Sequence, residues 1–289
     1  MSSAASIPPP PLHPAPDDPP TPRRTGDDRD WRPITSLFAL LGGFGGAILG
    51  AVVVGLIAGL FGASLTDPPP SVSIIGTVVQ DICLIGAALY FAHLAARPLP
   101  SHFGLRAARP WPAVGWAALA YTAFYAFTAA WVALLGTKPV DENLPKQLGA
   151  DKSTVALVAV ALLVSVVAPL AEEFFFRGYF YGALRNWNVL GAALITGLTF
   201  GAIHAGSAQW EFLLPLAFFG ASLCWLRERT GSLYPGIVLH CANNSIAFGV
   251  SQHWGWEIGV LFLGSVAVFW VVAIVVRTRW DASAAVPAA

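Results

Sequence analysis

Long apolar stretches, separated by short polar breaks, recur through most of this 289-residue sequence. A helix needs about 20 residues to cross about 30 Å of hydrocarbon, and most of the stretches are that long. Because lipid leaves no partner for unpaired backbone groups, such stretches must be helical. The expected fold is an all-α, polytopic membrane helix bundle of about eight transmembrane helices, near residues 34–64, 72–95, 111–136, 154–176, 189–205, 210–227, 233–250 and 256–276.

Composition supports a bilayer as the solvent of this chain. Hydrophobic residues make up 56% of the sequence and charged residues 11%, against about 25% charged in an average soluble domain. The net charge of zero argues against a nucleic-acid partner. The three cysteines lie in apolar stretches without CxxC spacing, so they indicate neither a disulfide framework nor a thiolate zinc site.

The two ends and the charge distribution predict an orientation. Residues 1–30 are rich in proline and are expected to form a disordered tail. With eight spans, 13 arginines fall on the side of the N-terminus, and only Lys138, Lys146 and Lys152 fall on the other. The positive-inside rule then predicts a multi-pass protein of the cell membrane with both termini on the cytoplasmic side. The excess of arginine over lysine favours a bacterial source.

Glycines at regular spacing mark the first span. Gly42, Gly46 and Gly50 lie four residues apart. This spacing is typical of a close helix-packing or dimer face, although membrane helices are glycine-rich in general. The oligomeric state is therefore left open.

Ionisable residues inside the spans carry most of the functional information, because each costs about 3 kcal/mol to place in hydrocarbon. Asp81 is expected to hydrogen-bond a neighbouring helix. The remainder occur in three short segments of the later spans: Glu172, Glu173 and Arg177; His204; and His240 with Asn244.

The segment AEEFFFRGYFYGAL, from Ala171 to Leu184, holds two adjacent glutamates and an arginine. Arg177 lies four residues after Glu173, so the two share a helix face and can pair. Glu172 points about 100° away and is left free to act as a base. The alternative is an ion-pair cluster without chemistry.

Helix register predicts that the three segments meet. If the fourth and fifth spans turn at residues 186–188, Glu172 and His204 both lie roughly 23–25 Å from the turn. His240 and Asn244 are four residues apart on one face of the seventh span. We therefore expect Glu172, His204, His240 and Asn244 to converge in one cavity.

Two versions of one reaction are open for such a cavity. Glu172, His204 and His240 are ligand types of a hydrolytic zinc site with a position for water. Without a metal, Glu172 could deprotonate a water while the histidines and the Asn244 amide stabilise the oxyanion. Both versions attack an amide carbonyl with water. HExxH, GxSxG and GxxxxGK[ST] motifs are absent from the sequence.

The segments EEFFFR (172–177), FGAIH (200–204) and HCANN (240–244) resemble the EExxxR, FxxxH and HxxxN motifs of one family. This is the CPBP family of CAAX proteases and bacteriocin-processing enzymes, also called Abi. The resemblance covers about residues 154–250 and implies an intramembrane metalloprotease core. It implies that Glu172 activates water, that Glu173 and Arg177 support it, and that His204, His240 and Asn244 line the metal or oxyanion site.

The predicted organisation is a tail (1–30), N-terminal helices (31–153), a catalytic core (154–250) and a last helix with a short tail (251–289). The predicted function is an endopeptidase acting on a membrane-associated protein or peptide, with Zn²⁺ as the candidate cofactor. One alternative is a non-proteolytic scaffold or regulator that binds partner membrane proteins. Another is a transporter, against which the absence of a clear internal repeat argues.

Overall fold

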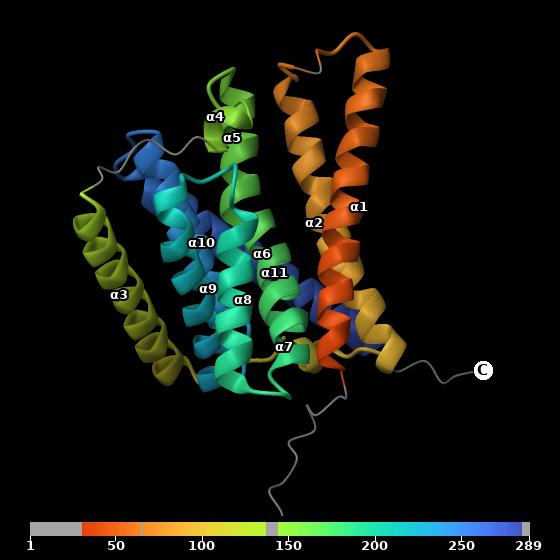
Figure 1. Ribbon diagram of the computed structural model, residues 1–289, viewed down its shortest axis with the longest axis vertical. Coiled ribbons are helices and arrows are strands. Elements are labelled where there is room, and N and C mark those ends of the chain that lie inside the picture. The colour runs from red at the N-terminus through yellow and green to blue at the C-terminus, as the bar shows by residue number, and fades with distance from the viewer. Residues whose placement is uncertain (1–30, 65, 137–143, 285–289) are drawn as a thin grey trace, which may run out of the picture.

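The computed structural model describes residues 31–64, 66–136 and 144–284 (Figure 1). The predicted tail lies outside these ranges. Regular structure in the described residues is helical. The α-helices are α1 (Pro33–Leu60), α2 (Pro70–Ala95), α3 (Pro110–Leu135), α4 (Leu144–Gln147), α5 (Thr154–Leu162), α6 (Ala168–Glu172), α7 (Tyr181–Leu184), α8 (Val189–Ile203), α9 (Trp210–Thr230), α10 (Tyr234–Ser251) and α11 (Glu257–Ala284). A 3₁₀ turn η1 (Pro100–Phe103) and two π-helical stretches, η2 (Leu163–Val167) and η3 (Glu173–Phe180), complete the set.

The all-helical membrane bundle predicted from the sequence is confirmed, and each predicted span corresponds to a helix. Five helical segments of the described chain are long and apolar enough to cross a membrane: Pro33–Leu60, Pro70–Ala95, Pro110–Leu135, Thr154–Leu184 and Glu257–Thr278. Helix α8 is apolar but shorter. The predicted end of the fourth span at residue 176 is wrong, because α5, η2, α6, η3 and α7 form one continuous helix to Leu184.

That long helix, which we call the central helix (residues 154–184), begins at an N-cap residue and contains two π-helical stretches, η2 and η3. The Ser153 side chain accepts a hydrogen bond from the N–H of Ala156. In η2 the N–H of Ala168 donates to the carbonyl of Leu163, five residues back. Such π-helical stretches are rare and occur frequently at functional sites. The second one, η3, begins at Glu173.

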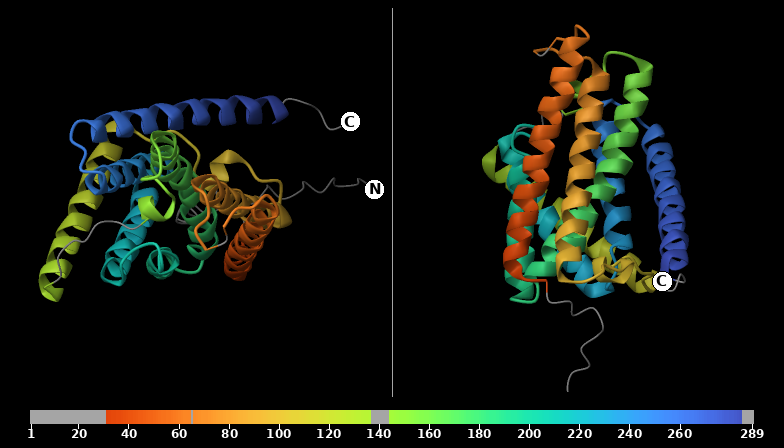
Figure 2. Two further views of the ribbon diagram at one scale, coloured as in Figure 1. Left: turned by 90° about the horizontal axis from the view of Figure 1, so that it is seen from above. Right: turned by 90° about the vertical axis from the view of Figure 1, so that its right-hand side faces the viewer.

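Helices α1 and α2 form an antiparallel hairpin beside the central helix (Figures 1 and 2). Of the two interpretations left open for the glycines of the first span, the structure favours close helix packing, with α2 as the partner. A Cβ atom at Gly42 would lie 3.6 Å from Phe91, and one at Gly46 would lie 3.4 Å from the Sγ atom of Cys83. These glycines thus face α2, although Gly42 itself is exposed and Gly46 is half-buried.

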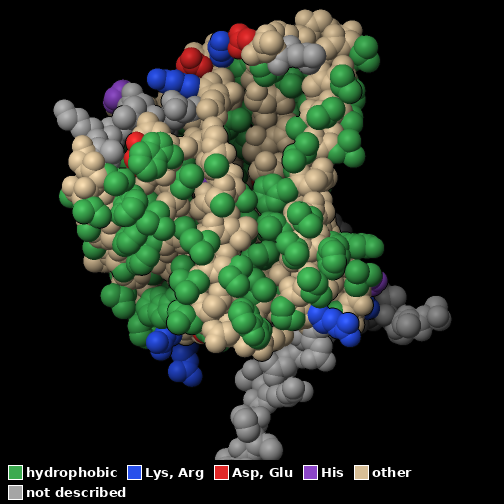
Figure 3. Space-filling model, viewed as in Figure 1, with side chains coloured by type: hydrophobic (Ala, Val, Ile, Leu, Met, Phe, Trp, Pro, Cys, Tyr) green, Lys and Arg blue, Asp and Glu red, His purple; other side chains and the backbone are tan. Residues whose placement is uncertain are grey.

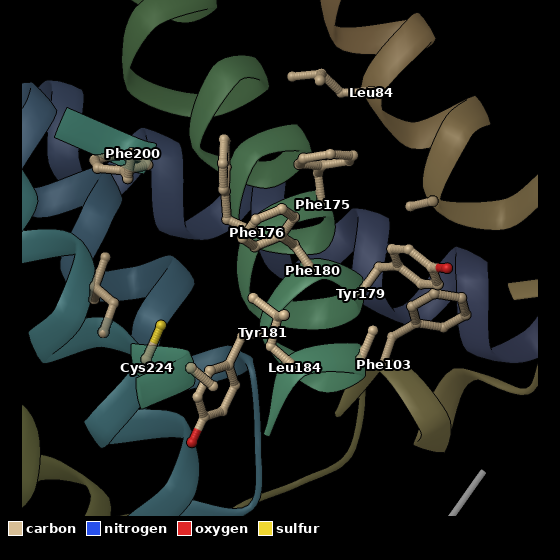
Figure 4. Packing of buried hydrophobic residues seen from close by; sticks show 14 of the residues in the cluster. Leu84, Phe103, Phe175, Phe176, Tyr179, Phe180, Tyr181, Leu184, Phe200 and Cys224 are labelled. Atoms are coloured by element: carbon tan, nitrogen blue, oxygen red, sulfur yellow. The ribbon is translucent and has the colours of Figure 1, made fainter. Parts of the chain in front are cut away.

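The central helix holds the core of the bundle. Helix α2 packs along η3, η2 packs on α10 and α11, and α8 contacts η3. Every side chain from Phe175 to Tyr181 is buried. Their rings project to several sides of the helix and meet residues of other segments, including Leu84, Phe103 and Phe200 (Figure 4). The chain thus surrounds the glutamate-bearing helix with other elements and fixes the orientation of its polar side chains.

Candidate active site

His240 on α10 lies against both glutamates of the central helix. Its Nδ1 atom is 3.0 Å from Oε1 of Glu173, and its Nε2 atom is 3.6 Å from Oε2 of Glu172. The Glu173 side chain has no exposed surface, whereas 13% of the Glu172 side chain is exposed. A carboxylate can only accept hydrogen bonds, so the Nδ1–H of His240 donates to Glu173. Glu172 is then the carboxylate open to a ligand.

Arg177 compensates the buried charge of Glu173, as predicted. Its Nη1 atom lies 2.8 Å from Oε1 of Glu173, and its Nη2–H donates to the carbonyl of Gly220 on α9 at 3.1 Å. The guanidinium also stands 4.3 Å from the ring centroid of Phe200, in cation–π geometry. Since both ionised side chains are fully buried, each depends on the other for its compensation.

Glycine on α10 makes room for this pair. A Cβ atom at Gly236 would lie 3.1 Å from Oε2 of Glu173. One turn further along α10, His240 is itself only 2% exposed. Phe200 and Phe219 pack on its ring, with centroids 5.7 and 5.5 Å away. The motifs did not single out Gly220, Gly236 or Phe219, because nothing local in the sequence says which residues of α9 and α10 face Glu173.

His204 lies at the C-cap of α8 and is half-buried. Its Nδ1 atom is 2.7 Å from the carbonyl of Phe200, which can only accept, so Nδ1 carries the hydrogen. In the neutral ring Nε2 is then the unprotonated nitrogen. The ring of Phe200 contacts both histidines, with centroids 4.7 Å from His204 and 5.7 Å from His240.

Asn244 has a partner that the sequence did not suggest. Its Nδ2–H donates to the carbonyl of Val164 in η2 at 2.9 Å. After Ala168 bonds to Leu163, the next donor in the π pattern would be residue 169, which is proline and has no N–H. The amide of Asn244 therefore supplies the donor that Pro169 lacks. The oxyanion role expected for Asn244 stays a prediction.

The donor set suits zinc in chemistry but not in spacing. The Nε2 atom of His204 and the Glu172 carboxylate are of the right types. Within residues 31–64, 66–136 and 144–284, however, no three His, Cys, Asp or Glu side chains are grouped closely enough to hold a metal ion. We therefore derive no step through a metal, and the zinc assignment to Glu172, His204 and His240 stays a prediction.

Asp81 on α2 is the one predicted polar contact that fails. It is 2% exposed, and neither carboxylate oxygen has a hydrogen-bond partner among the described residues. The expectation that it hydrogen-bonds a neighbouring helix is thus wrong. Asp81 does lie close enough to Glu172 for the two charges to interact. It shares a buried face of α2 with Leu84, which packs in the aromatic core.

Comparison with known proteins gives a family match over the candidate site and partial matches to individual relatives. Residues 154–246 match the family described as type II CAAX prenyl endopeptidase Rce1-like. An Escherichia coli protein described as an uncharacterized 24.3 kDa protein is 35% identical over 105 residues, which are 34% of this chain and 47% of that protein. No solved structure matches.

Two further relatives come from Lactococcus lactis and Bacillus subtilis. The Lactococcus lactis UPF0177 protein YxdF is 28% identical over 82 residues, or 28% of this chain and 44% of that protein. The Bacillus subtilis protein described as "Putative membrane peptidase YdiL" is 31% identical over 91 residues, or 31% of this chain and 36% of that protein. The chain covers less than half the length of each of these three relatives.

The family match confirms the resemblance that the EExxxR, FxxxH and HxxxN motifs indicated. With the apolar helices described above, it makes the chain a multi-pass membrane protein. Residues 154–246, which carry every residue of the candidate site, accordingly match the model of the Rce1-like family of type II CAAX prenyl endopeptidases.

Proposed function

We propose that this protein is an intramembrane endopeptidase that hydrolyses a peptide bond of a membrane-associated protein or peptide. The observation that carries the proposal is the position of His240 between Glu172 and Glu173, at 3.6 and 3.0 Å. A fully buried carboxylate orients the imidazole, and a partly exposed carboxylate faces its other nitrogen. This is an arrangement of base and orienting group suited to activating water.

In the proposed reaction Glu172 is the general base. Its carboxylate takes a proton from a water molecule, and the hydroxide attacks the carbonyl carbon of the peptide bond. His240, protonated and held through Nδ1 by Glu173, donates its Nε2–H to the oxyanion of the tetrahedral intermediate. Glu172 then gives its proton to the leaving amine nitrogen as the C–N bond breaks. Arg177 holds Glu173 in place through their 2.8 Å ion pair without touching the substrate.

We place this chemistry on the residues of the chain alone. Both ring nitrogens of His240 face glutamates. Among the described residues, the Nε2 atom of His204 is not grouped with two further His, Cys, Asp or Glu side chains that could bind a metal ion with it. The proposal therefore assigns His204, together with His240, to stabilising the oxyanion. Loss of turnover on removal of divalent metal would contradict this assignment.

The test compares wild type with Glu172→Gln on a library of membrane-anchored peptides, using purified full-length protein in detergent. A missing general base should lower turnover about 10²- to 10⁴-fold. Glu211→Gln is the matched control, since Glu211 sits in the first turn of α9 and takes no part in the site. Equal cleavage by wild type and Glu172→Gln would contradict the proposal. A Glu172→Gln protein that still complements a deletion strain would favour the scaffold alternative.

A further inference from the structure

The two ends of the bundle differ in charge. At one end lie the starts of α1 and α3 and the ends of α2, α7 and α9, with arginines that include Arg32, Arg97, Arg106, Arg109, Arg185 and Arg229. Glu228, which pairs with Arg185, also lies at this end. We call this the arginine end. The described part of the opposite end carries Lys146 and Lys152 together with acidic residues such as Asp67 and Asp151. Figure 3 shows the same polarity, with blue side chains at the base and mixed colours at the top. The positive-inside rule places the arginine end in the cytoplasm.

Between Glu172 and the arginine end, most of the central helix is buried. Seven consecutive residues, from Phe175 to Tyr181, are buried, and most of them are aromatic. Below them Phe103 of η1 is fully buried and contacts Trp31, with ring centroids 5.3 Å apart. Figure 4 shows Phe103 beside Tyr179 at this level.

Hydrogen bonds hold the segment that follows η1 against the turn between α9 and α10. The N–H of Leu233 donates to the carbonyl of Gly104 at 2.8 Å. The Nε–H of Arg106 donates to the carbonyl of Gly231 at 2.6 Å. A peptide entering from the arginine end would have to displace the aromatic layer and break these contacts.

Toward the opposite end the site is more open. His204 directly follows the last residue of α8, and the next two residues, Ala205 and Gly206, are exposed. Glu172 has exposed side-chain surface, and Ala168, one turn before it, is half-buried. Figure 3 shows the molecule hollowed in this same half, between the α1–α2 hairpin and the helices beside it. A cavity of ≈ 440 Å³ between α1 and α2, lined by Ala51, Gly55 and Thr77 among others, also lies in this half.

We propose that the candidate site is reached from the end opposite the arginines, and that its substrates are membrane-anchored peptides whose cleavage site is presented on the extracytoplasmic side. The part of the proposal that concerns substrates rests on the proposed peptidase function. The route of access itself is a property of the fold and can be measured without turnover.

The test uses single cysteines in full-length protein from which Cys83, Cys224 and Cys241 have been replaced by alanine. Ala168→Cys reports on the site, Ala205→Cys on the end opposite the arginines, and Ala107→Cys, at an exposed position, on the arginine end. A charged, membrane-impermeant maleimide is applied to spheroplasts of an expressing bacterium and, separately, to inverted membrane vesicles. Gel filtration shows that each variant remains folded.

In spheroplasts we expect labelling of Ala168→Cys and Ala205→Cys, with at least tenfold less at Ala107→Cys. In inverted vesicles we expect the reverse. Labelling of Ala168→Cys from the same side as Ala107→Cys, or from neither side in folded protein, would overturn the proposal. Because no peptide is cleaved in this assay, an inactive protein with the expected labelling would contradict the peptidase function and leave the route of access standing.

Discussion

At the scale of single residues, the site is a relay of buried polar groups in which each side chain fixes the next. Arg177 holds Glu173, Glu173 holds His240, and His240 faces Glu172. The first contact could be predicted from the four-residue spacing of Glu173 and Arg177. The contact between Glu173 and His240 could not be derived from helical spacing, since the two residues lie on different helices, 67 positions apart in the sequence.

The relay makes a stability prediction about Arg177. Arg177→Met should destabilise the protein by about 3–5 kcal/mol, because it leaves the Glu173 carboxylate buried without its counter-charge. The Arg177→Met/Glu173→Gln double variant should recover part of that loss. Thermal unfolding in detergent measures both.

The matched control for Arg177 is Arg185→Met, which breaks a partly exposed ion pair with Glu228 at 3.3 Å. Such pairs contribute about 0–1 kcal/mol, so the Tm should change little. Equal losses for Arg177→Met and Arg185→Met would contradict the assignment of a buried, mutually dependent pair.

Replacing Asp81 is expected to raise the stability of the protein, whereas replacing Arg177 lowers it. Because neither carboxylate oxygen has a partner in the described structure, replacement by an apolar side chain of similar shape should stabilise the fold. We expect Asp81→Leu to raise the Tm in detergent and Asp81→Asn, which still needs partners, to raise it less. A lower Tm for Asp81→Leu would mean that the carboxylate has a stabilising contact.

At the scale of helices, glycine sets how closely α8 approaches α9. A Cβ atom at Gly197 would lie 2.5 Å from the carbonyl of Ala217, and one at Gly201 would clash with the carbonyl of Leu213. Phe200 and His204 stand on the same helix. The spacing of the α8 helix against its neighbour therefore positions one histidine of the site.

We expect Gly201→Ala to lower both the Tm and the peptidase turnover, because α8 must move away from α9. Gly45→Ala is the control, since a Cβ atom there meets no described atom within 4 Å. Peptide cleavage and thermal unfolding are measured for both variants. Unchanged turnover in Gly201→Ala would contradict a role for this close approach in placing His204.

The widened turn η2 links Pro169 to Asn244, and the link can be measured by a double-mutant cycle. Asn244→Ala removes the donor to the Val164 carbonyl and should lower the Tm. Pro169→Ala restores a backbone N–H in η2, so Asn244→Ala should cost less in the Pro169→Ala background. Additive changes in Tm would contradict the exchange of one donor for the other.

Hydropathy and motif spacing predicted where the helices lie better than where they end. The predicted fourth span ends at residue 176, one residue before the charged Arg177. In the structure Glu173, the Gly220 carbonyl and the Phe200 ring surround Arg177, so the helix continues to Leu184. The π-helical turns and the donor exchange at Pro169 depend on tertiary contacts that local sequence does not encode.

At the scale of the whole molecule, a partly exposed carboxylate, Glu172, lies next to the oriented imidazole of His240, within the segment that matches the Rce1-like family model. If the reaction runs on these side chains alone, a chelator such as EDTA should leave turnover unchanged. Zinc-free and zinc-supplemented protein are compared on the same peptide. A large loss with EDTA that zinc restores would favour the metal version built on Glu172, His204 and His240.

The most direct test of the account is the fate of water oxygen. Purified protein cleaves a membrane-anchored peptide from the library in H₂¹⁸O, and mass spectrometry examines the new carboxyl terminus. We predict that wild type produces a fragment with one ¹⁸O atom and that Glu172→Gln produces essentially none under the same conditions. Cleavage without ¹⁸O in the new carboxylate, or equal labelled product from Glu172→Gln, would contradict hydrolysis by water activated at Glu172.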